Sequence, residues 1–70
     1  MDKLMYLPGR ENKEYWELLD KLRNNGKSIS STWAGDYLIQ TYEMDGDIYE
    51  VWENEELGIQ HKIERRQNEN

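Results

Sequence analysis

The sequence predicts a small α+β domain in which one amphipathic helix packs on a three-stranded antiparallel meander. Three observations support this fold class: helical spacing of apolar residues near the N-terminus, two β-rich runs joined by Asp45-Gly46, and an alternating apolar run near the C-terminus. The 70 residues make one domain. Because a chain of this size buries only about 60% of the surface that it exposes when unfolded, we expect extra stability from a partner or a second copy.

Residues 11–26 predict the helix. Apolar side chains recur there at positions i, i+3, i+4 and i+7 and so share one face: Tyr15, Leu18, Leu19 and Leu22. Asn12 is the expected N-cap, and Asn24-Asn25-Gly26 is expected to end the helix in a left-handed conformation. Before Pro8-Gly9, we expect Leu4–Leu7 to form either a short extra strand or an apolar arm.

A β-hairpin is predicted on both sides of Asp45-Gly46, because Asp-Gly favours a type I′ turn with positive φ at both central residues. A two-residue turn pairs Tyr42 with Tyr49 and Ile39 with Trp52. Side chains then alternate between two faces, and a longer turn would exchange these faces. The more apolar face, which we expect to meet the helix, holds Leu38, Tyr42, Met44, Tyr49 and Val51. The other face holds Tyr37, Ile39, Thr41, Glu43, Ile48, Glu50 and Trp52.

The segment 27–35 before this hairpin is rich in Ser and Thr and is expected to be a connection. A second helix over Ser31–Tyr42 is the alternative, which Gly35 and the β-branched residues Ile39 and Thr41 disfavour.

The third strand is predicted where apolar residues alternate with polar ones, at Leu57, Ile59, His61 and Ile63. Its register stays open. A two-residue turn at Asn54-Glu55 aligns Leu57 with Trp52, whereas a three-residue turn aligns Ile59 with Val51. The predicted domain covers residues 1–65, and a disordered polar tail is expected over residues 66–70.

Charge is unevenly distributed along the chain. The net charge is −6, but no Lys or Arg lies between Ser28 and His61, where the acids are Asp36, Glu43, Asp45, Asp47, Glu50, Glu53, Glu55 and Glu56. The chain has no Phe, so its rings are Tyr and Trp, which are common at interfaces because each carries a polar group. One helix cannot cover both faces of the hairpin. We therefore expect an exposed surface that is both acidic and aromatic.

No catalytic, cofactor or metal site is predicted. The chain has no Cys to act as a nucleophile, His61 has no recognisable partner, and Asp45-Gly46-Asp47 lacks the later ligands of a calcium loop. A weak divalent-ion site at Glu55-Glu56 near His61 is less favoured than a solvated turn. An aromatic cage for a cationic ligand is a further option, built from Trp33, Tyr37, Tyr49 and Trp52.

Sequence composition also limits the partners. The pI near 4.6 and the lack of a basic stripe argue against direct nucleic-acid binding. No apolar run approaches the about 20 residues that span a membrane, and the N-terminal apolar run is too short for a signal peptide. The expectation is a cytoplasmic protein.

We therefore expect a non-enzymatic protein-binding module whose acidic aromatic hairpin docks on a basic, nucleic-acid-binding surface of a partner and inhibits or regulates it. The predicted partner-binding residues are Tyr37, Glu43, Glu50, Trp52, Glu53, Glu55 and Glu56. In size, acidity and lack of catalytic motifs, the chain is similar in kind to small acidic inhibitors encoded by bacteriophages and mobile elements, some of which mimic the charge of DNA. This likeness rests on bulk properties and transfers no residue role.

Two alternatives remain open. The first is a homodimer that buries the same sheet face against its own copy. The second is a DNA-binding regulator that uses the helix and Arg65-Arg66.

Overall fold

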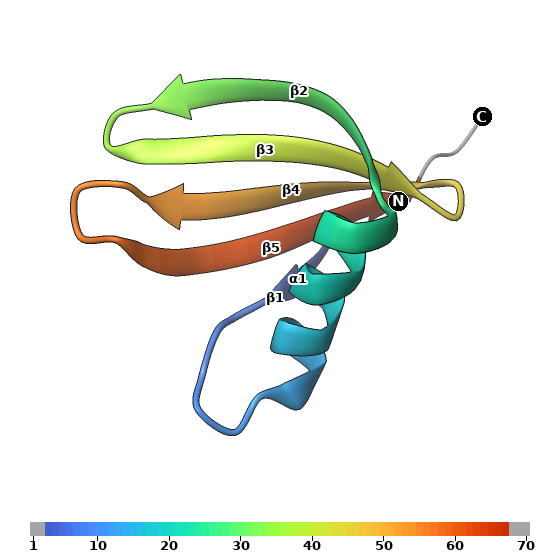
Figure 1. The fold of residues 1–70 in the computed structure, drawn as a ribbon, viewed down its shortest axis with the longest axis horizontal. Coiled ribbons are helices and arrows are strands. Elements are labelled where there is room, and N and C mark those ends of the chain that lie inside the picture. Colours follow the sequence, from blue (N-terminus) through green and yellow to red (C-terminus); the bar gives the residue numbers. More distant parts are fainter. Residues whose placement is uncertain (1–2, 68–70) are drawn as a thin grey trace.

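The computed structural model describes residues 3–67, which form a five-stranded antiparallel sheet and one helix. Figure 1 shows the elements in chain order: β1 (Lys3–Tyr6), α1 (Lys13–Asn25), β2 (Lys27–Ala34), β3 (Tyr37–Met44), β4 (Asp47–Asn54) and β5 (Ile59–Gln67). The order across the sheet is β1-β5-β4-β3-β2. The last four strands therefore make a meander, and β1 pairs with the outer side of β5.

The predicted three-stranded meander is wrong, because the sheet has five strands. β1 is the short extra strand that was one of the two options for the N-terminal segment, whereas β2 was not expected. All eight residues of β2 are exposed. Because none of them enters the core, its sequence has no apolar alternation that would indicate a strand. It pairs along β3 through the turn at Gly35-Asp36, where Gly35 has φ 64°. The expected connection and the alternative helix over Ser31–Tyr42 are both replaced by this hairpin.

The helix α1 has the predicted apolar face. Tyr15, Leu19 and Leu22 are buried in it, and Leu18 packs against the same core. The Asn12 side chain caps the helix by accepting a hydrogen bond from the N–H of Tyr15 at 3.2 Å. This N-cap confirms the prediction.

The predicted left-handed end of α1 is wrong. Gly26 is extended, with φ −76° and ψ 153°, and its N–H donates to the Leu22 carbonyl oxygen at 2.9 Å. A Cβ atom at Gly26 would lie 2.6 Å from that same oxygen. Close approach of two backbone segments, rather than positive φ, therefore requires glycine here.

The β3–β4 hairpin has the predicted register. Asp45 and Gly46 have φ values of 53° and 84°, as a type I′ turn requires. Tyr42 pairs with Tyr49, and Ile39 pairs with Trp52. From this hairpin, Tyr42, Met44, Tyr49 and Val51 pack in or against the core beneath α1.

Both predicted registers of the third strand are wrong. The turn Glu55–Gly58 has four residues, and the Asn54 side chain accepts a hydrogen bond from the N–H of Leu57 at 2.9 Å. Ile63, not Ile59, pairs with Val51. Trp52 and Glu53 pair with Lys62 and Gln60, so that His61 is the extra residue of a β-bulge.

The bulge puts Ile59 and Ile63 on opposite faces of the sheet, so that only Ile63 enters the core, while Leu57 lies in the turn. Ile63 is fully buried, whereas Leu57 is 67% exposed and Ile59 is 54% exposed. An uninterrupted alternation would have placed all three on one face. β5 itself continues to Gln67, into the segment expected to be a tail, and residues 68–70 lie outside the described part of the chain.

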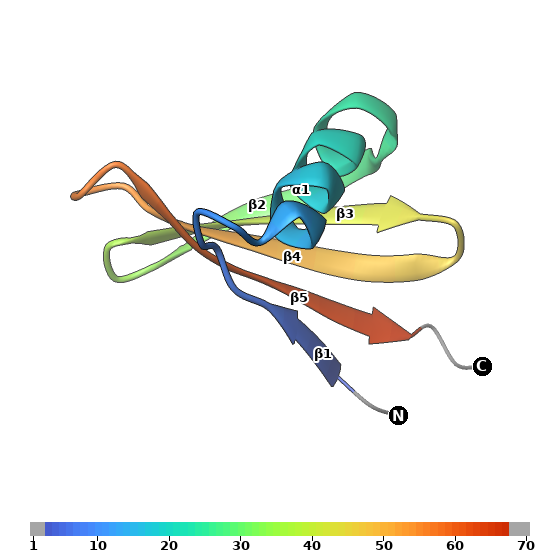
Figure 2. The same cartoon turned by 90° about the horizontal axis from the view of Figure 1, so that it is seen from below.

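The core lies between α1 and one face of the sheet, where Tyr49, Val51 and Ile63 meet the buried side chains of the helix. Figure 2 shows that α1 covers this face only. In Figure 1 the helix crosses the sheet nearer the β3–β4 turn, and the half with the β2–β3 and β4–β5 turns extends beyond it. We call the face opposite α1 the open face.

The register of β5 leads to a prediction about the stability of the fold. Ile63→Ala should lower the free energy of unfolding by about 2–5 kcal/mol, because it removes buried methyl and methylene groups and leaves a cavity. Ile59→Ala is the matched control and should change it by less than about 1 kcal/mol, because that side chain is half exposed. Chemical denaturation measures both. Equal losses at the two positions would contradict the observed register.

Tyr15 should make the fold sensitive to alkali. Burial raises the pKa of Tyr15 from 10.0 to about 12, with a further increase from Glu53 and an opposing effect of Arg23. Between pH 10 and pH 12 the unfolded chain therefore loses this proton more readily than the folded one, and the free energy of unfolding falls as pH rises. Tyr15→Phe should reduce that fall without abolishing it, because burial also raises the pKa of Tyr49. Denaturant titrations across this range measure the slope, which must differ between the two proteins.

Candidate functional site

The open face carries side chains from every strand of the meander. Residues directly opposite one another in antiparallel strands point to the same face, so the register defines the members of this face. On β3, β4 and β5 they are Tyr37, Ile39, Thr41, Glu43, Ile48, Glu50, Trp52, Asn54, Ile59, Lys62, Glu64 and Arg66. The predicted division of the hairpin into two faces is confirmed.

Three rings gather on this face. The centroid of Tyr37 lies 5.9 Å from that of Trp52 and 4.6 Å from that of His61. The bulge brings His61 to Tyr37 and Trp52, although the sequence places it on the apolar side of its strand. Ile39, paired with Trp52, is only 8% exposed, so the expectation that it faces solvent is wrong. Tyr37 and Trp52 are half-buried among side chains of their own face, and His61 beside them is exposed.

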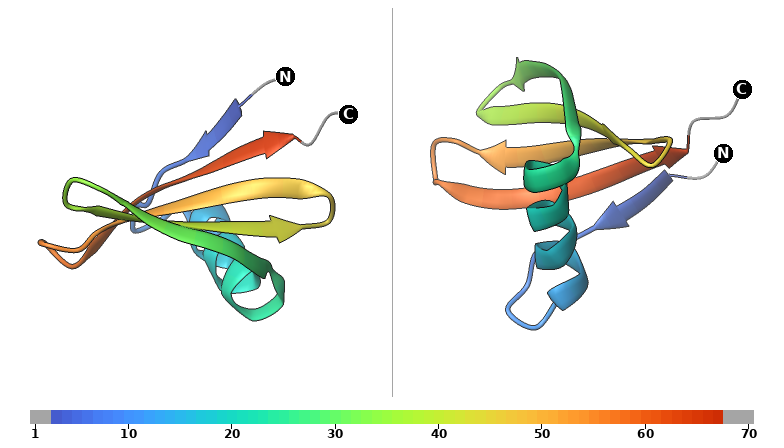
Figure 3. Two further views of the ribbon diagram at one scale, coloured as in Figure 1. Left: turned by 90° about the horizontal axis from the view of Figure 1, so that it is seen from above. Right: turned by 45° about the vertical axis from the view of Figure 1, so that its right-hand side comes forward.

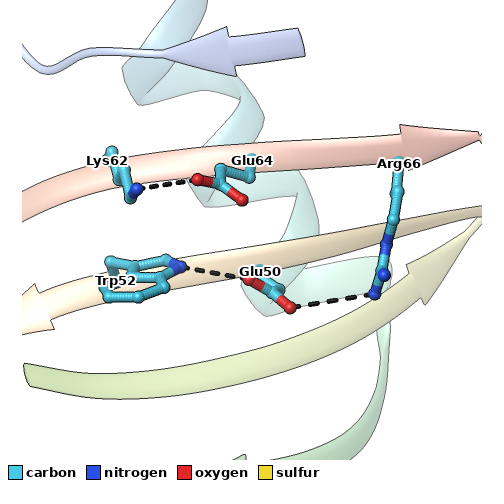
Figure 4. Close-up of polar contacts among 5 residues, drawn as sticks. All are labelled: Glu50, Trp52, Lys62, Glu64 and Arg66. Carbon is cyan, nitrogen blue, oxygen red and sulfur yellow. Dashed lines mark hydrogen bonds and ion pairs between the residues drawn. The ribbon is translucent and has the colours of Figure 1, made fainter. Parts of the chain in front are cut away.

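Bases from β5 compensate the carboxylates at the centre of the open face (Figure 4). Glu50 accepts a hydrogen bond from Trp52 Nε1 at 3.2 Å and lies 3.8 Å from Arg66 Nη2. Lys62 Nζ lies 2.7 Å from Glu64 Oε2 and 4.4 Å from the centroid of the Trp52 ring. The centre of this face is therefore a mixed-charge surface, which differs from the uniformly acidic one expected.

The sequence indicates that the two bases Lys62 and Arg66 lie on the same face of their strand. Lys62, Glu64 and Arg66 are spaced by two residues, as side chains on one face of a strand are. Their position beside Glu50 and Trp52 follows only once the register of β5 is known.

The four residues of the possible aromatic cage do not lie together in the structure. Tyr37 and Trp52 share the open face, whereas Tyr49 belongs to the core beneath α1 and Trp33 pairs with Leu38 of the helix-covered face. The cation over Trp52 is the chain's own Lys62. Among residues 3–67, no group of three or more His, Asp or Glu side chains could hold a metal ion.

The predicted partner-binding residues fall in three places. Tyr37, Trp52 and Glu50 lie together on the open face. Glu43 shares this face but pairs with Ile48 and Lys27, towards the β3–β4 turn. Three more lie at the opposite end of the sheet: Glu53, which pairs with Leu38 and Gln60, and Glu55 and Glu56 of the β4–β5 turn.

Two turns meet at that opposite end. The N–H of Glu55 donates to the carbonyl oxygen of Asp36 at 3.0 Å, which ties the β4–β5 turn to the β2–β3 turn. The two views in Figure 3 place both turns at the same end of the sheet, beyond the helix. We call these turns and the adjoining ends of their strands, residues 33–38 and 52–60, the distal end.

The distal end combines acidic and apolar side chains. Its carboxylates are Asp36, Glu53, Glu55 and Glu56, and its exposed large apolar side chains are Trp33, Leu57 and Ile59. Within the described part of the chain, none of these four carboxylates takes part in an ion pair. A surface that combines uncompensated carboxylates with exposed apolar side chains therefore lies here, at one end of the sheet.

A comparison with protein families, curated proteins and solved structures finds no significant match to this chain. Over residues 3–67, no helix has the length and apolar character needed to cross a membrane.

The ion pair of the open face should contribute little to stability. Glu50→Gln keeps an acceptor for Trp52 Nε1 but removes the charge that faces Arg66, and the Arg66 side chain is 58% exposed. We expect the free energy of unfolding to fall by less than about 1 kcal/mol, as for other solvent-exposed ion pairs. A double-mutant cycle with Arg66→Gln measures the coupling. A coupling above about 2 kcal/mol would show that this pair has a structural role.

Proposed function

We propose that this protein is a non-enzymatic protein-binding module that docks its distal end on a basic surface of a partner protein. One observation carries the proposal. The hydrogen bond between Glu55 and Asp36 joins two turns at one end of the sheet, and this end carries both unpaired carboxylates and exposed apolar side chains.

The apolar side chains supply the contact area. Leu57 and Ile59 are both more than half exposed, and Ile59 shares the open face with Tyr37, since both pair with Asn54. Large apolar and aromatic side chains that gather on a protein surface are typical of interfaces. Because Tyr37, Trp52 and His61 already contact one another, their conformations are partly fixed before binding, which lowers the entropic cost of association.

The carboxylates indicate which charge the partner surface should carry. Asp36, Glu53, Glu55 and Glu56 are close to no Lys or Arg in the sequence, since the chain has none between Lys27 and Lys62. Such a surface attracts a basic patch and speeds the encounter with it. Strongly basic patches are characteristic of nucleic-acid-binding proteins, so this is the partner class that the chemistry favours.

The geometry refines the set of residues. Glu50 is engaged by Trp52 and Arg66, and Glu43 lies away from the distal end, so the proposal no longer depends on either. It rests instead on Tyr37, Trp52, Glu53, Glu55 and Glu56, joined by Asp36, Leu57 and Ile59.

The test compares two triple variants that remove equal charge. Glu53→Gln/Glu55→Gln/Glu56→Gln neutralises the distal end, and Glu14→Gln/Glu17→Gln/Asp20→Asn neutralises the same number of carboxylates on α1. Wild type and both variants are immobilised, the proteins captured from cells of the source are identified, and the captured partner is purified and titrated at several salt concentrations. We expect the distal variant to bind about tenfold more weakly or worse, mainly through slower association.

The helix variant should retain wild-type affinity. A purified partner that binds both variants equally, or whose affinity does not fall with salt, would rule out docking through the distal carboxylates. Leu57→Ser supplies an uncharged test of the same surface and should also weaken binding.

A further inference from the structure

The outer edge of β2 is an unusual feature of this fold. In the described sheet β2 pairs only with β3, so the backbone groups on its other side face solvent. All eight of its side chains are exposed, including those of Ile29 and Trp33. An edge of this kind is a template for pairing with another strand.

Proteins usually protect such edges with charged residues, proline or short strands. None of these devices is present between Ser28 and Ala34, where the sequence is Ser-Ile-Ser-Ser-Thr-Trp-Ala. The one irregularity is a bulge at Ile29, near the start of the strand, which leaves Ser30–Ala34 in regular register with β3. The opposite edge of the sheet differs, since β1 has only four residues.

The turn geometry shows which backbone groups are free. A two-residue turn is closed by a hydrogen-bonded pair, here Ala34 and Tyr37, and bonded and non-bonded pairs then alternate along the strands. Thr32 therefore bonds to β3, whereas the N–H and C=O groups of Ser31 and Trp33 point away from it. These two residues form the free part of the regular edge.

We propose that β2 pairs antiparallel with β2 of a second copy of this chain, about a twofold axis that passes beside Thr32. In this register each Ser31 lies opposite Trp33 of the other copy, and each of the two residues donates one backbone hydrogen bond and accepts one. The sheets then join into one continuous antiparallel sheet.

Side chains of β2 fit this self-pairing. The two Trp33 rings become diagonal neighbours across the axis, within the reach of aromatic side chains. An antiparallel arrangement also brings Lys27, at the start of β2, to the end where the second copy has Asp36, just beyond Ala34. The strand is thus complementary to itself in hydrogen bonding and charge, as a twofold interface requires.

The pairing is expected to be weak. An edge contact of about five residues on each side covers less than the about 1,200 Å² of total area that marks stable interfaces. We therefore expect a reversible dimer with a dissociation constant in the micromolar range, detectable by sedimentation velocity over a range of protein concentrations.

The principal test compares Ser31→Pro with Ser31→Ala. Proline removes the outward N–H of Ser31 without removing a hydrogen bond to β3, whereas alanine keeps that N–H and removes only the hydroxyl group. The proline variant should weaken dimerisation at least about tenfold, and the alanine variant should dimerise as wild type does. Trp33→Lys is a second variant that leaves the backbone intact and should weaken the dimer by placing two like charges near the axis.

Amide exchange tests the register directly. The N–H groups of Ser31 and Trp33 should become protected as concentration rises, whereas those of Thr32 and Ala34 should be protected at every concentration because they bond to β3. A protein that stays monomeric at hundreds of micromolar overturns the proposal, as does a dimer that Ser31→Pro and Trp33→Lys leave unchanged. The distal variant Glu53→Gln/Glu55→Gln/Glu56→Gln should dimerise normally, which separates this test from that of partner docking.

Discussion

The contact between α1 and the central strands of the sheet determines which surfaces of this protein remain exposed. Tyr15, Leu19 and Leu22 bury their side chains against Tyr49, Val51 and Ile63, and this contact forms the hydrophobic core. A helix that spans Lys13–Asn25 can cover only part of one face of a five-stranded sheet. The open face, the distal end and the outer edge of β2 therefore have to be stabilised by interactions of their own.

The bulge at His61 provides some of these stabilising interactions. By inserting one residue between Gln60 and Lys62, it directs Ile63 into the core and His61 to the rings of Tyr37 and Trp52. The same shift places two bases of β5 beside residues of β4: Lys62 over the ring of Trp52, and Arg66 beside Glu50. On the helix-covered face, Arg65 lies 3.4 Å from Asp47. One extra residue thus changes both the packing and the electrostatics of the sheet.

How much of this arrangement could be predicted depends on how local each signal is. The helix and the β3–β4 hairpin were predictable, because Asn12, the apolar stripe and Asp45-Gly46 act within a few residues of one another. β2 was not, since a strand with every side chain exposed has no apolar pattern and forms through backbone pairing with β3. The register of β5 was not predictable either, because a bulge does not change composition and shifts every residue after it.

The same distinction applies to charge. The acid-rich segment between Ser28 and His61 is continuous in sequence, but in space β5 brings Arg65 to Asp47 and Arg66 to Glu50, whereas the four carboxylates of the distal end take part in no ion pair within the described residues. A linear charge run therefore overstates the extent of an acidic surface whenever a neighbouring strand carries the opposite charge. The charge of the surface depends on which residues lie in the same row across the sheet. These rows can be assigned only when the register of the strands is known.

The two proposed binding surfaces, the distal end and the β2 edge, are compatible with each other. In an antiparallel β2–β2 pair the two copies run in opposite directions, so their distal ends lie at opposite ends of the joined sheet. Each distal end would then remain free on its β4–β5 side, where Glu55, Glu56 and Leu57 lie. A dimer of this form presents two acidic surfaces that face apart, and it can engage two basic patches at once if their spacing matches the joined sheet. Weak self-association would in that case raise the apparent affinity for a partner with repeated basic sites, without any new contact between this chain and the partner.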